Sequence, residues 1–166
     1  MAVFRSVDEL ARLTQGPQET TDGQRVLVTT NGCFDLMHVG HLRYLKAARA
    51  FGDRLVVLLN SDASVRRLKG PSRPILPEDE RAELLDGLAC VDHVGIFDED
   101  TPERWLEALK PNIHVKGGQY SADTLPEAAL LKTLGTRMEF VEMVQGRSTS
   151  DLILKIQSLT SPLPTQ

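Results

Sequence analysis

The sequence contains no long apolar run, few cysteines and no excess of basic residues, and each absence excludes a class of protein. No segment approaches the roughly 20 consecutive apolar residues of a membrane-spanning helix, so no membrane partner is expected. Residues 1–9 include acidic side chains and lack the apolar segment of a signal peptide. The two cysteines, Cys33 and Cys90, cannot build a disulfide framework, and neither lies in a Cys-x-x-Cys pair. We therefore expect a soluble, cytoplasmic protein whose thiols are reduced and are buried or line a pocket.

The overall charge is weakly acidic. Lys and Arg number 19 against 23 Asp and Glu, which gives a formal net charge of −4 at pH 7. A nucleic-acid-binding surface is normally basic, so no nucleic acid partner is expected. A phosphate can still be held at one local site, by backbone amides at a helix N-terminus and a few cations.

The length and the apolar content predict one α/β domain. A chain of 166 residues with 41% hydrophobic residues is long enough to bury a full core. Residues 1–24 are interpreted as an N-terminal helical extension, because Ser6 and Glu9 have the spacing of a capping box. Residues 25–160 are expected to form the domain, and residues 161–166 a flexible tail.

Strands and helices alternate through this domain. Short apolar runs suited to buried parallel strands occupy residues 25–30, 55–59, 91–97, 113–116 and 138–141. Caps, breakers and helical spacing predict helices over residues 39–51, 77–88, 101 onward, 125–134 and 148–158. Thr101 is expected to cap the third of these helices, with Pro102 at its first position. The pattern predicts a Rossmann-like, doubly wound, five-stranded parallel sheet in a three-layer α/β/α arrangement.

Ligands of such sheets bind beyond the carboxyl ends of the strands, where the strand order reverses. The segments that follow the expected strands there are residues 31–41, 60–73, 116–120 and 145–150. We expect the functional residues to lie in these segments.

The first segment places His38 and His41 three residues apart at the expected start of a helix. Both imidazoles can therefore face the same side of that helix start. Its free amides and its dipole favour an anion, and Gly40 leaves room for a phosphate to approach the backbone. We interpret the segment as a phosphate site. The alternatives are a plain turn and a partial zinc site with Cys33 as third ligand, for which no fourth ligand has suitable spacing nearby.

Two cations follow the second expected strand. Lys69 is expected on a glycine-containing loop, from which its point charge can reach a triphosphate. Arg73 can clamp a phosphate through its planar guanidinium group. The alternatives are a solvated lysine and an arginine that only decorates a surface loop.

The last two segments offer main-chain groups to a ligand. Gly117 and Gly118 let backbone groups approach a flat base closely, which suits recognition of adenine. Ser148, Thr149 and Ser150 open the final helix with hydroxyls and free amides, which form a second anion site. The alternatives are a flexible turn and an ordinary helix cap.

Together these segments resemble the nucleotidylyltransferase superfamily, whose His-x-Gly-His signature stands here as His38-Val39-Gly40-His41. The flanking Asn31-Gly32-Cys33-Phe34-Asp35 is typical of the small bacterial members. The matching motifs extend over about residues 25–157. They are most similar to those of the adenylyltransferases that join D-glycero-β-D-manno-heptose 1-phosphate to ATP. That domain is fused to a sugar kinase in many bacteria and is expected to stand alone here.

The resemblance implies transfer of an adenylyl group from ATP to a sugar 1-phosphate, with release of pyrophosphate and formation of an ADP-sugar. It implies catalytic roles for His38, His41 and Lys69. It implies nucleotide binding by Asn31, Gly32, Cys33, Phe34, Gly40, His41, Lys116, Gly117, Gly118, Tyr120, Ser148, Thr149 and Ser150. Asp35, Asp62 and Arg73 are expected to bind the acceptor, with ordering of the loop backbone as the alternative for both carboxylates. Mg²⁺ is the expected cofactor, held mainly by the triphosphate and water without protein ligands, and a homodimer is compatible with the sequence.

Two positions depart from the pattern of the heptose enzymes. Gln119 stands where those enzymes usually have aspartate, and Arg147 stands where they often have a small or apolar residue. Both changes shift the local charge in the positive direction near the expected nucleotide and acceptor sites, because Gln119 removes a negative charge and Arg147 adds a positive one. They leave open a cytidylyltransferase that acts on glycerol 3-phosphate or a related small phosphate. A non-catalytic nucleotide-binding regulatory module is the alternative from another class.

Overall fold

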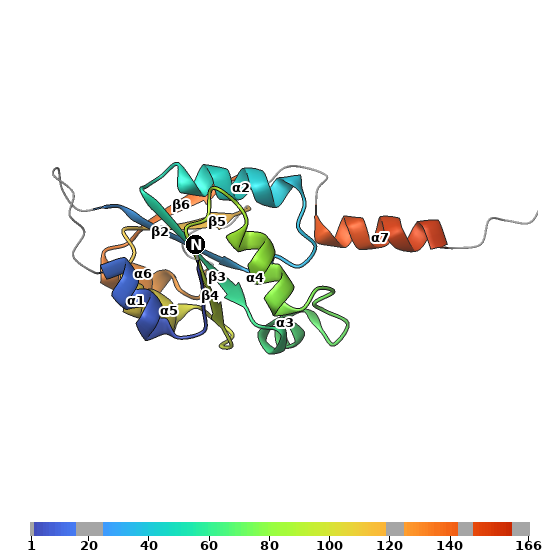
Figure 1. Cartoon of the computed structure of the whole chain (residues 1–166), viewed down its shortest axis with the longest axis horizontal. Coiled ribbons are helices and arrows are strands. Elements are labelled where there is room, and N and C mark those ends of the chain that lie inside the picture. Colours follow the sequence, from blue (N-terminus) through green and yellow to red (C-terminus); the bar gives the residue numbers. More distant parts are fainter. Residues whose placement is uncertain (1, 16–24, 119–124, 143–147, 161–166) are drawn as a thin grey trace, which may run out of the picture.

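A parallel sheet lies between two layers of helices in the computed structural model, which describes residues 2–15, 25–118, 125–142 and 148–160 (Figure 1). Its strands are β1 (Ala2–Phe4), β2 (Leu27–Gly32), β3 (Arg54–Asn60), β4 (His93–Phe97), β5 (Ile113–Gly117) and β6 (Arg137–Val141). They pair in the order β1-β4-β3-β2-β5-β6, and every pair is parallel. The predicted Rossmann-like α/β class is confirmed, whereas the predicted count of five strands is wrong because the sheet has six.

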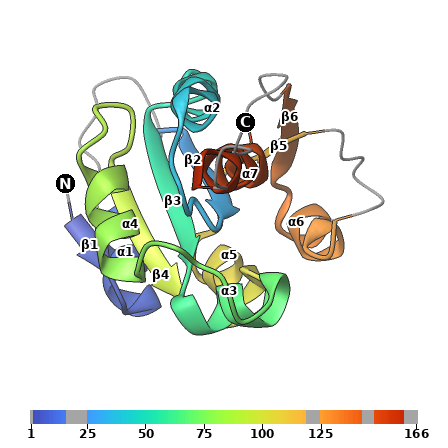
Figure 2. The ribbon, with the colours of Figure 1, turned by 90° about the vertical axis from the view of Figure 1, so that its right-hand side faces the viewer.

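The helices are α1 (Val7–Gln15), α2 (Val39–Arg49), α3 (Asp62–Lys69), α4 (Glu78–Asp86), α5 (Glu103–Leu109), α6 (Ala128–Leu134) and α7 (Thr149–Thr160). Helices α2 and α4 cover one face of the sheet, while α1, α5 and α6 cover the other (Figure 2). Strand β3 shows why both faces need a cover. Leu55, Val57 and Leu59 pack in the first core, and Val56 and Leu58 pack in the second. Among the described residues, no helix is both long and apolar enough to cross a membrane.

The N-terminal segment supplies the sixth strand. Val3 of β1 lies in register with Val94 of β4, and Leu10 of α1 is fully buried in the second core beside α5. Residues 2–15 therefore pack into the domain, β1 as an edge strand of the sheet and α1 on one of its faces. Residues 16–24 and 161–166 lie outside the described residues, so the limits of the domain stay a prediction.

Helix α3 corrects the prediction that Lys69 lies on a loop. The Ser61 hydroxyl accepts a hydrogen bond from the Ser64 backbone N–H at 3.0 Å and caps the helix, and Val65 is fully buried. Lys69 is the last residue of this helix. Residues 62–69 contain few apolar residues, so this helix was not predicted from the sequence. The Ser61 cap and the burial of Val65 stabilise it.

Two of the three caps expected from the sequence are confirmed. The Ser6 hydroxyl accepts from the Glu9 backbone N–H at 3.4 Å, and the Ser148 hydroxyl accepts from the Asp151 backbone N–H at 3.0 Å. The cap at Thr101 is wrong, since Pro102 occupies the N-cap position of α5 without a side-chain bond. The Thr101 hydroxyl donates to the Glu103 carboxylate at 3.0 Å.

The strand order reverses between β2 and β5. The chain runs from β2 outward to β3 and β4, and then returns to form β5 and β6 on the other side of β2. The carboxyl ends of β2 and β5, at Gly32 and Gly117, therefore border the crevice in which a doubly wound sheet binds its ligand.

Candidate active site

A cleft of about 540 Å³ opens at this edge of the sheet. Its described lining comes from the ends of two strands and from the termini of three helices with the loops beside them. The lining residues are Asn31, Gly32, Cys33, Phe34, Asp35, His41, Tyr44, Leu68, Lys69, Arg73, Lys116, Gly117, Thr149 and Ser150. The structure thus brings together residues from all four strand-end segments that the sequence singled out.

The start of helix α2 is held by a reciprocal cap between its two histidines. His38 Nδ1 accepts from the Gly40 backbone N–H at 3.1 Å, and His41 Nδ1 accepts from the His38 backbone N–H at 3.3 Å. A ring nitrogen that accepts carries no hydrogen, so both neutral imidazoles have their hydrogen on Nε2. His41 lines the cleft, and its Nε2–H is therefore available as a donor. His38 is not among the lining residues that the structure describes.

The environment of His41 keeps its imidazole neutral. Burial, together with the neighbouring His38, lowers the pKa of His41 to about 4. The centroids of the two rings lie 4.0 Å apart, so positive charges on both imidazoles would repel each other. At neutral pH His41 is a hydrogen-bond donor without a net charge.

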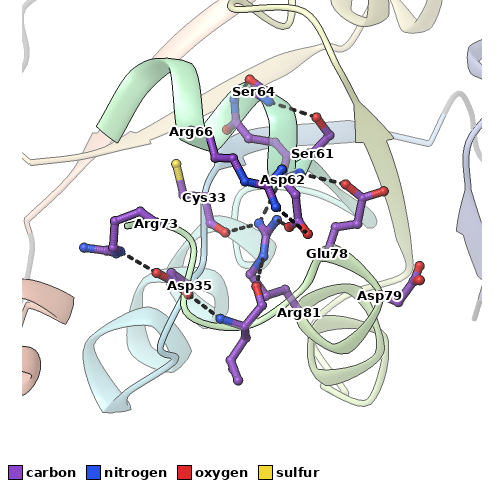
Figure 3. A network of polar contacts seen from close by, with 12 residues as sticks. Cys33, Asp35, Ser61, Asp62, Ser64, Arg66, Arg73, Glu78, Asp79 and Arg81 are labelled. Atoms are coloured by element: carbon purple, nitrogen blue, oxygen red, sulfur yellow. Dashed lines mark hydrogen bonds and ion pairs between the residues drawn. The ribbon is translucent and has the colours of Figure 1, made fainter. Parts of the chain in front are cut away.

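Asp35 holds the loop between α3 and α4 against the cleft. The side chain is buried, and its carboxylate accepts from the backbone N–H groups of Ile75 and Leu76 at 2.8 and 3.0 Å. It also accepts from Arg73 Nε at 2.6 Å (Figure 3). The carboxylate is thus committed to the loop backbone, which was the alternative to acceptor binding. Arg73 lines the cleft and pairs with Asp35 through Nε alone among the described contacts, so its terminal amino groups can still bind a ligand.

Asp62 is not brought to the cleft. Its Oδ1 accepts from Arg81 Nη2 at 2.7 Å, and Arg66 lies 3.9 Å from its other oxygen. Its position at the start of α3 directs it to these arginines rather than to the described lining.

Arg81 is a buried residue that the sequence reasoning missed. It donates to the backbone oxygens of Cys33, Asn60 and Leu76 at 2.6, 2.9 and 3.0 Å (Figure 3). Together with Asp62 these contacts tie the ends of β2 and β3 to the loop that precedes α4. The sequence offers one weak signal, because Arg81 stands next to the buried Ala82 in α4. Sequence alone does not distinguish a buried arginine from a solvated one.

Tyr44 is a second residue that the sequence reasoning missed. Its hydroxyl donates to the Val115 backbone oxygen at 2.9 Å and accepts from the Thr30 hydroxyl at 2.6 Å. It therefore bridges β2 and β5 beneath the cleft. Burial raises the pKa of Tyr44 above its ordinary value, which keeps the hydroxyl protonated.

Lys69 is an exposed cation in the described lining of the cleft. It stands at the C-terminus of α3, and no ion pair or hydrogen bond to another described residue involves it. Its ammonium group is therefore free to meet an anionic ligand. This arrangement agrees with the predicted role, although the element that carries the residue is a helix.

The other predicted nucleotide ligands divide into two groups. Thr149 and Ser150 lie at the N-terminus of α7 and line the cleft, and the Thr149 hydroxyl donates to the Leu36 backbone oxygen at 3.4 Å. At the end of β5, Lys116 and Gly117 line the cleft, and Gly118 follows with a positive φ of 113°. Tyr120, Gln119 and Arg147 lie outside the described residues.

Among the described residues, the cysteines and histidines do not gather into a metal site. Within the described ranges no group of three His, Cys, Asp or Glu residues could hold a metal ion. Cys33 lines the cleft as a free thiol, and burial raises its pKa above the usual value. The partial zinc site is not supported.

Known proteins are similar to this chain in sequence and in fold. Residues 29–158 match the family model described as cytidylyltransferase-like. The bifunctional protein HldE of Geotalea uraniireducens is 52% identical over 157 residues, which cover 95% of this chain and 31% of that protein. The bifunctional protein HldE of Geobacter sulfurreducens is 50% identical over 93% of this chain and 31% of its own length. The chain thus spans about a third of the length of these curated relatives.

Solved structures with the same fold include a lipopolysaccharide core biosynthesis protein from Thermoplasma volcanium. It is 30% identical with a TM-score of 0.60, over 75% of this chain and all of that one. The pantothenate synthetase of Thermus thermophilus has a TM-score of 0.59 over 87% of this chain and 62% of its own. At 14% identity this second likeness concerns the fold alone.

Proposed function

Because the chain belongs to the cytidylyltransferase-like family of nucleotidylyltransferases, we propose that it transfers the adenylyl group of ATP to a sugar 1-phosphate. The products are an ADP-sugar and pyrophosphate. D-glycero-β-D-manno-heptose 1-phosphate is the acceptor that the motifs around His38, Lys69 and Ser148 favour.

One observation carries the proposal. The N-termini of α2 and α7 and the C-terminal lysine of α3 all supply residues to one cleft at the carboxyl edge of the sheet. Helix N-termini carry the positive end of the helix dipole, and Lys69 adds a full charge. Such a cleft suits a triphosphate, although the whole chain is acidic.

The choice of acceptor rests on two further supports. The relatives at about 50% identity are named HldE, and the solved structure from Thermoplasma volcanium is titled a lipopolysaccharide core biosynthesis protein. Both names agree with the motif pattern of the heptose 1-phosphate adenylyltransferases. Arg73, which lines the cleft and pairs with Asp35 through Nε alone among the described contacts, is proposed to bind the acceptor phosphate.

The proposed step is an in-line displacement at phosphorus. A phosphate oxygen of the sugar 1-phosphate forms a bond to the α-phosphorus of ATP, and the bond from that phosphorus to the oxygen bridging to the β-phosphate breaks. The electron pair leaves with pyrophosphate. The attacking oxygen is already ionised at pH 7, so no general base is required. Catalysis then consists of positioning and of neutralising the charge on the α-phosphate and the leaving group.

The described residues indicate how the protein serves this step. The Nε2–H of His41 donates to a phosphate oxygen, and His38 fixes the His41 ring through the helix cap. Lys69 neutralises the leaving pyrophosphate. Phe34, Asn31 and Gly32 line the cleft and are proposed to contact the nucleoside.

Magnesium enters as part of the nucleotide substrate. The carboxylate of the cleft, Asp35, is committed to Arg73 and to two backbone amides. The described residues therefore offer no ligand set for a resident metal, and Mg²⁺ is proposed to arrive on the triphosphate oxygens with water as its other ligands. A cytoplasmic location and a homodimer remain predictions.

Pyrophosphate release tests the proposal. The full chain is incubated with MgATP or MgCTP, each with the heptose 1-phosphate, glucose 1-phosphate or glycerol 3-phosphate. We expect release with ATP and the heptose 1-phosphate, at a rate at least tenfold above every other pair. Release only with CTP and glycerol 3-phosphate would establish the cytidylyltransferase alternative. Tight ATP binding without turnover on any acceptor would establish the regulatory module.

A further inference from the structure

A buried acid lies behind the cleft and is not used by the step described above. Glu127 precedes the first turn of α6, is 2% exposed and is absent from the described lining of the cleft. Its Oε1 lies 2.9 Å from Lys116 Nζ and 3.6 Å from Nε2 of the fully buried His114. A buried carboxylate is costly unless it is paired, so these contacts require an account.

Lys116 links this acid to the cleft. Its ammonium group donates to Asn31 Oδ1 at 2.7 Å while it contacts Glu127. Lys116 stands at the end of β5 and Asn31 at the end of β2, on the two sides of the crevice where the strand order reverses. With Oδ1 of Asn31 accepting from the ammonium group, the carboxamide keeps its Nδ2 as the donor for a ligand.

The charges of Glu127, His114 and Lys116 nearly cancel, so this end of the cleft is less positive than the end near Lys69. Burial alone would raise the pKa of Glu127, but the contacts with His114 and Lys116 outweigh it and lower that pKa to about 2. Burial lowers the pKa of His114, so its ring is neutral. The negative charge of Glu127 therefore cancels the positive charge of Lys116. Lys69, which has no ion pair with another described residue, and the helix N-termini remain as the places for phosphate.

We propose that Glu127 is a positioning residue, which holds Lys116 against Asn31 so that the Asn31 amide donates to the nucleoside part of the nucleotide. Lys116 is accordingly not a phosphate ligand. The inference rests on the proposed function for the identity of the nucleotide. It differs from the role that the motif pattern implied for Lys116, since the lysine acts through Asn31.

Binding of two probes separates this role from phosphate binding. Isothermal titration calorimetry measures a non-hydrolysable ATP analogue and inorganic pyrophosphate, on the wild type, Glu127→Gln, Lys116→Met and the double variant. Glutamine keeps the size of Glu127, and the partly buried Lys116 can be replaced by methionine without a void. Glu139→Gln removes a half-exposed charge of β6 and is the matched control.

We expect Glu127→Gln and Lys116→Met each to weaken binding of the analogue about tenfold. The reason is that the Asn31 amide is no longer held in place and its hydrogen bond to the nucleoside is lost. Pyrophosphate binding is expected not to weaken, and the double variant is expected to bind no worse than Lys116→Met within about twofold. In steady-state assays the KM for ATP rises while kcat changes little.

Equal losses for pyrophosphate and the analogue in Lys116→Met would make the lysine a phosphate ligand and overturn the proposal. Losses that multiply in the double variant would also overturn it, because they would make Glu127 independent of Lys116. Should Glu127→Gln fail to fold, Lys116→Met with the two probes still decides. A wild type that binds the analogue but never releases pyrophosphate would refute the proposed function alone.

Discussion

The His41 imidazole accepts a hydrogen bond from the backbone N–H of His38 at 3.3 Å, and this bond orients the ring before any ligand arrives. The two rings lie 4.0 Å apart at the start of α2, whose first amides are capped by these side chains. Preorganised donors of this kind need no rearrangement when charge develops on a phosphate.

Replacement of His41 by alanine is expected to reduce kcat by about 10²–10³-fold, the usual cost of one preorganised donor. Initial rates of pyrophosphate release measure the effect. His93→Gln, at the start of β4 and outside the described lining, is the control and should keep near wild-type turnover. Turnover of His41→Ala above a tenth of the wild-type value would contradict the assignment.

The protonation of His41 is expected to occur near pH 4, because burial and His38 lower its pKa to about 4. In the unfolded chain a histidine titrates near about 6.5. The unfolded state therefore binds more protons between these two values, and stability falls as the pH drops from about 6.5 to 4. NMR titration of the imidazole signals gives the pKa directly, and His41→Gln should remove this part of the pH dependence. A His41 pKa above 6 would refute the expectation.

Loss of the Lys69 charge is expected to slow the reaction about 10–100-fold and to make it less sensitive to salt, since an exposed cation is screened. Lys69→Met and Lys46→Met are compared at low and moderate ionic strength. Lys46 is exposed on α2 and does not line the cleft, so its variant should behave as the wild type. Equal rates for the two variants would exclude Lys69 from the mechanism.

The buried carboxylate of Asp35 is expected to contribute about 2 kcal/mol to stability, because it accepts a charge-assisted bond and two backbone bonds. Asp35→Asn removes the charge and weakens the hold on the loop that carries Arg73. Urea unfolding measures the loss, and turnover is expected to fall in parallel. Asp79→Asn, at a carboxylate that is 82% exposed, should unfold as the wild type does. Equal stabilities of the two variants would contradict the role given to Asp35.

Arg81→Met is expected to lower the free energy of unfolding by about 3 kcal/mol, because it removes a fully buried guanidinium group with its partly buried ion pair and its backbone hydrogen bonds. The change leaves Asp62 without its 2.7 Å partner and removes the donor to three backbone oxygens. Chemical denaturation provides the measurement, with Arg67→Met on the exposed side of α3 as the control. A variant of Arg81 as stable as this control would show that the network is dispensable.

The sequence predicted what depends on local pattern. The apolar run Leu55–Leu59 forms β3, and the hydroxyl of Ser148 caps α7, because strand burial and capping are decided by neighbouring residues. The resemblance around His38 and Ser148 likewise identified segments that the topology does bring to one cleft.

What the sequence could not predict depends on distant partners. The three residues of β1 are too short a run to predict a strand from the sequence. The strand forms because it pairs with β4, with Val3 in register with Val94. Arg81 looks like an ordinary cation until the fold places Asp62 beside it, and the pairing of Lys116 with Glu127 is equally invisible in the sequence. The partner in each case lies 11 or more residues away in the chain, beyond the reach of helical or strand spacing.

The pairing of β1 with β4 has a practical consequence for protein engineering. A chain trimmed of residues 2–15 would leave the edge of β4 without its neighbour and would uncover the apolar surface beneath Leu10. Open strand edges recruit other strands, so such a shortened chain is expected to aggregate during expression. Purification tags and fusion partners are therefore better attached through a spacer that leaves these first residues free to complete the sheet.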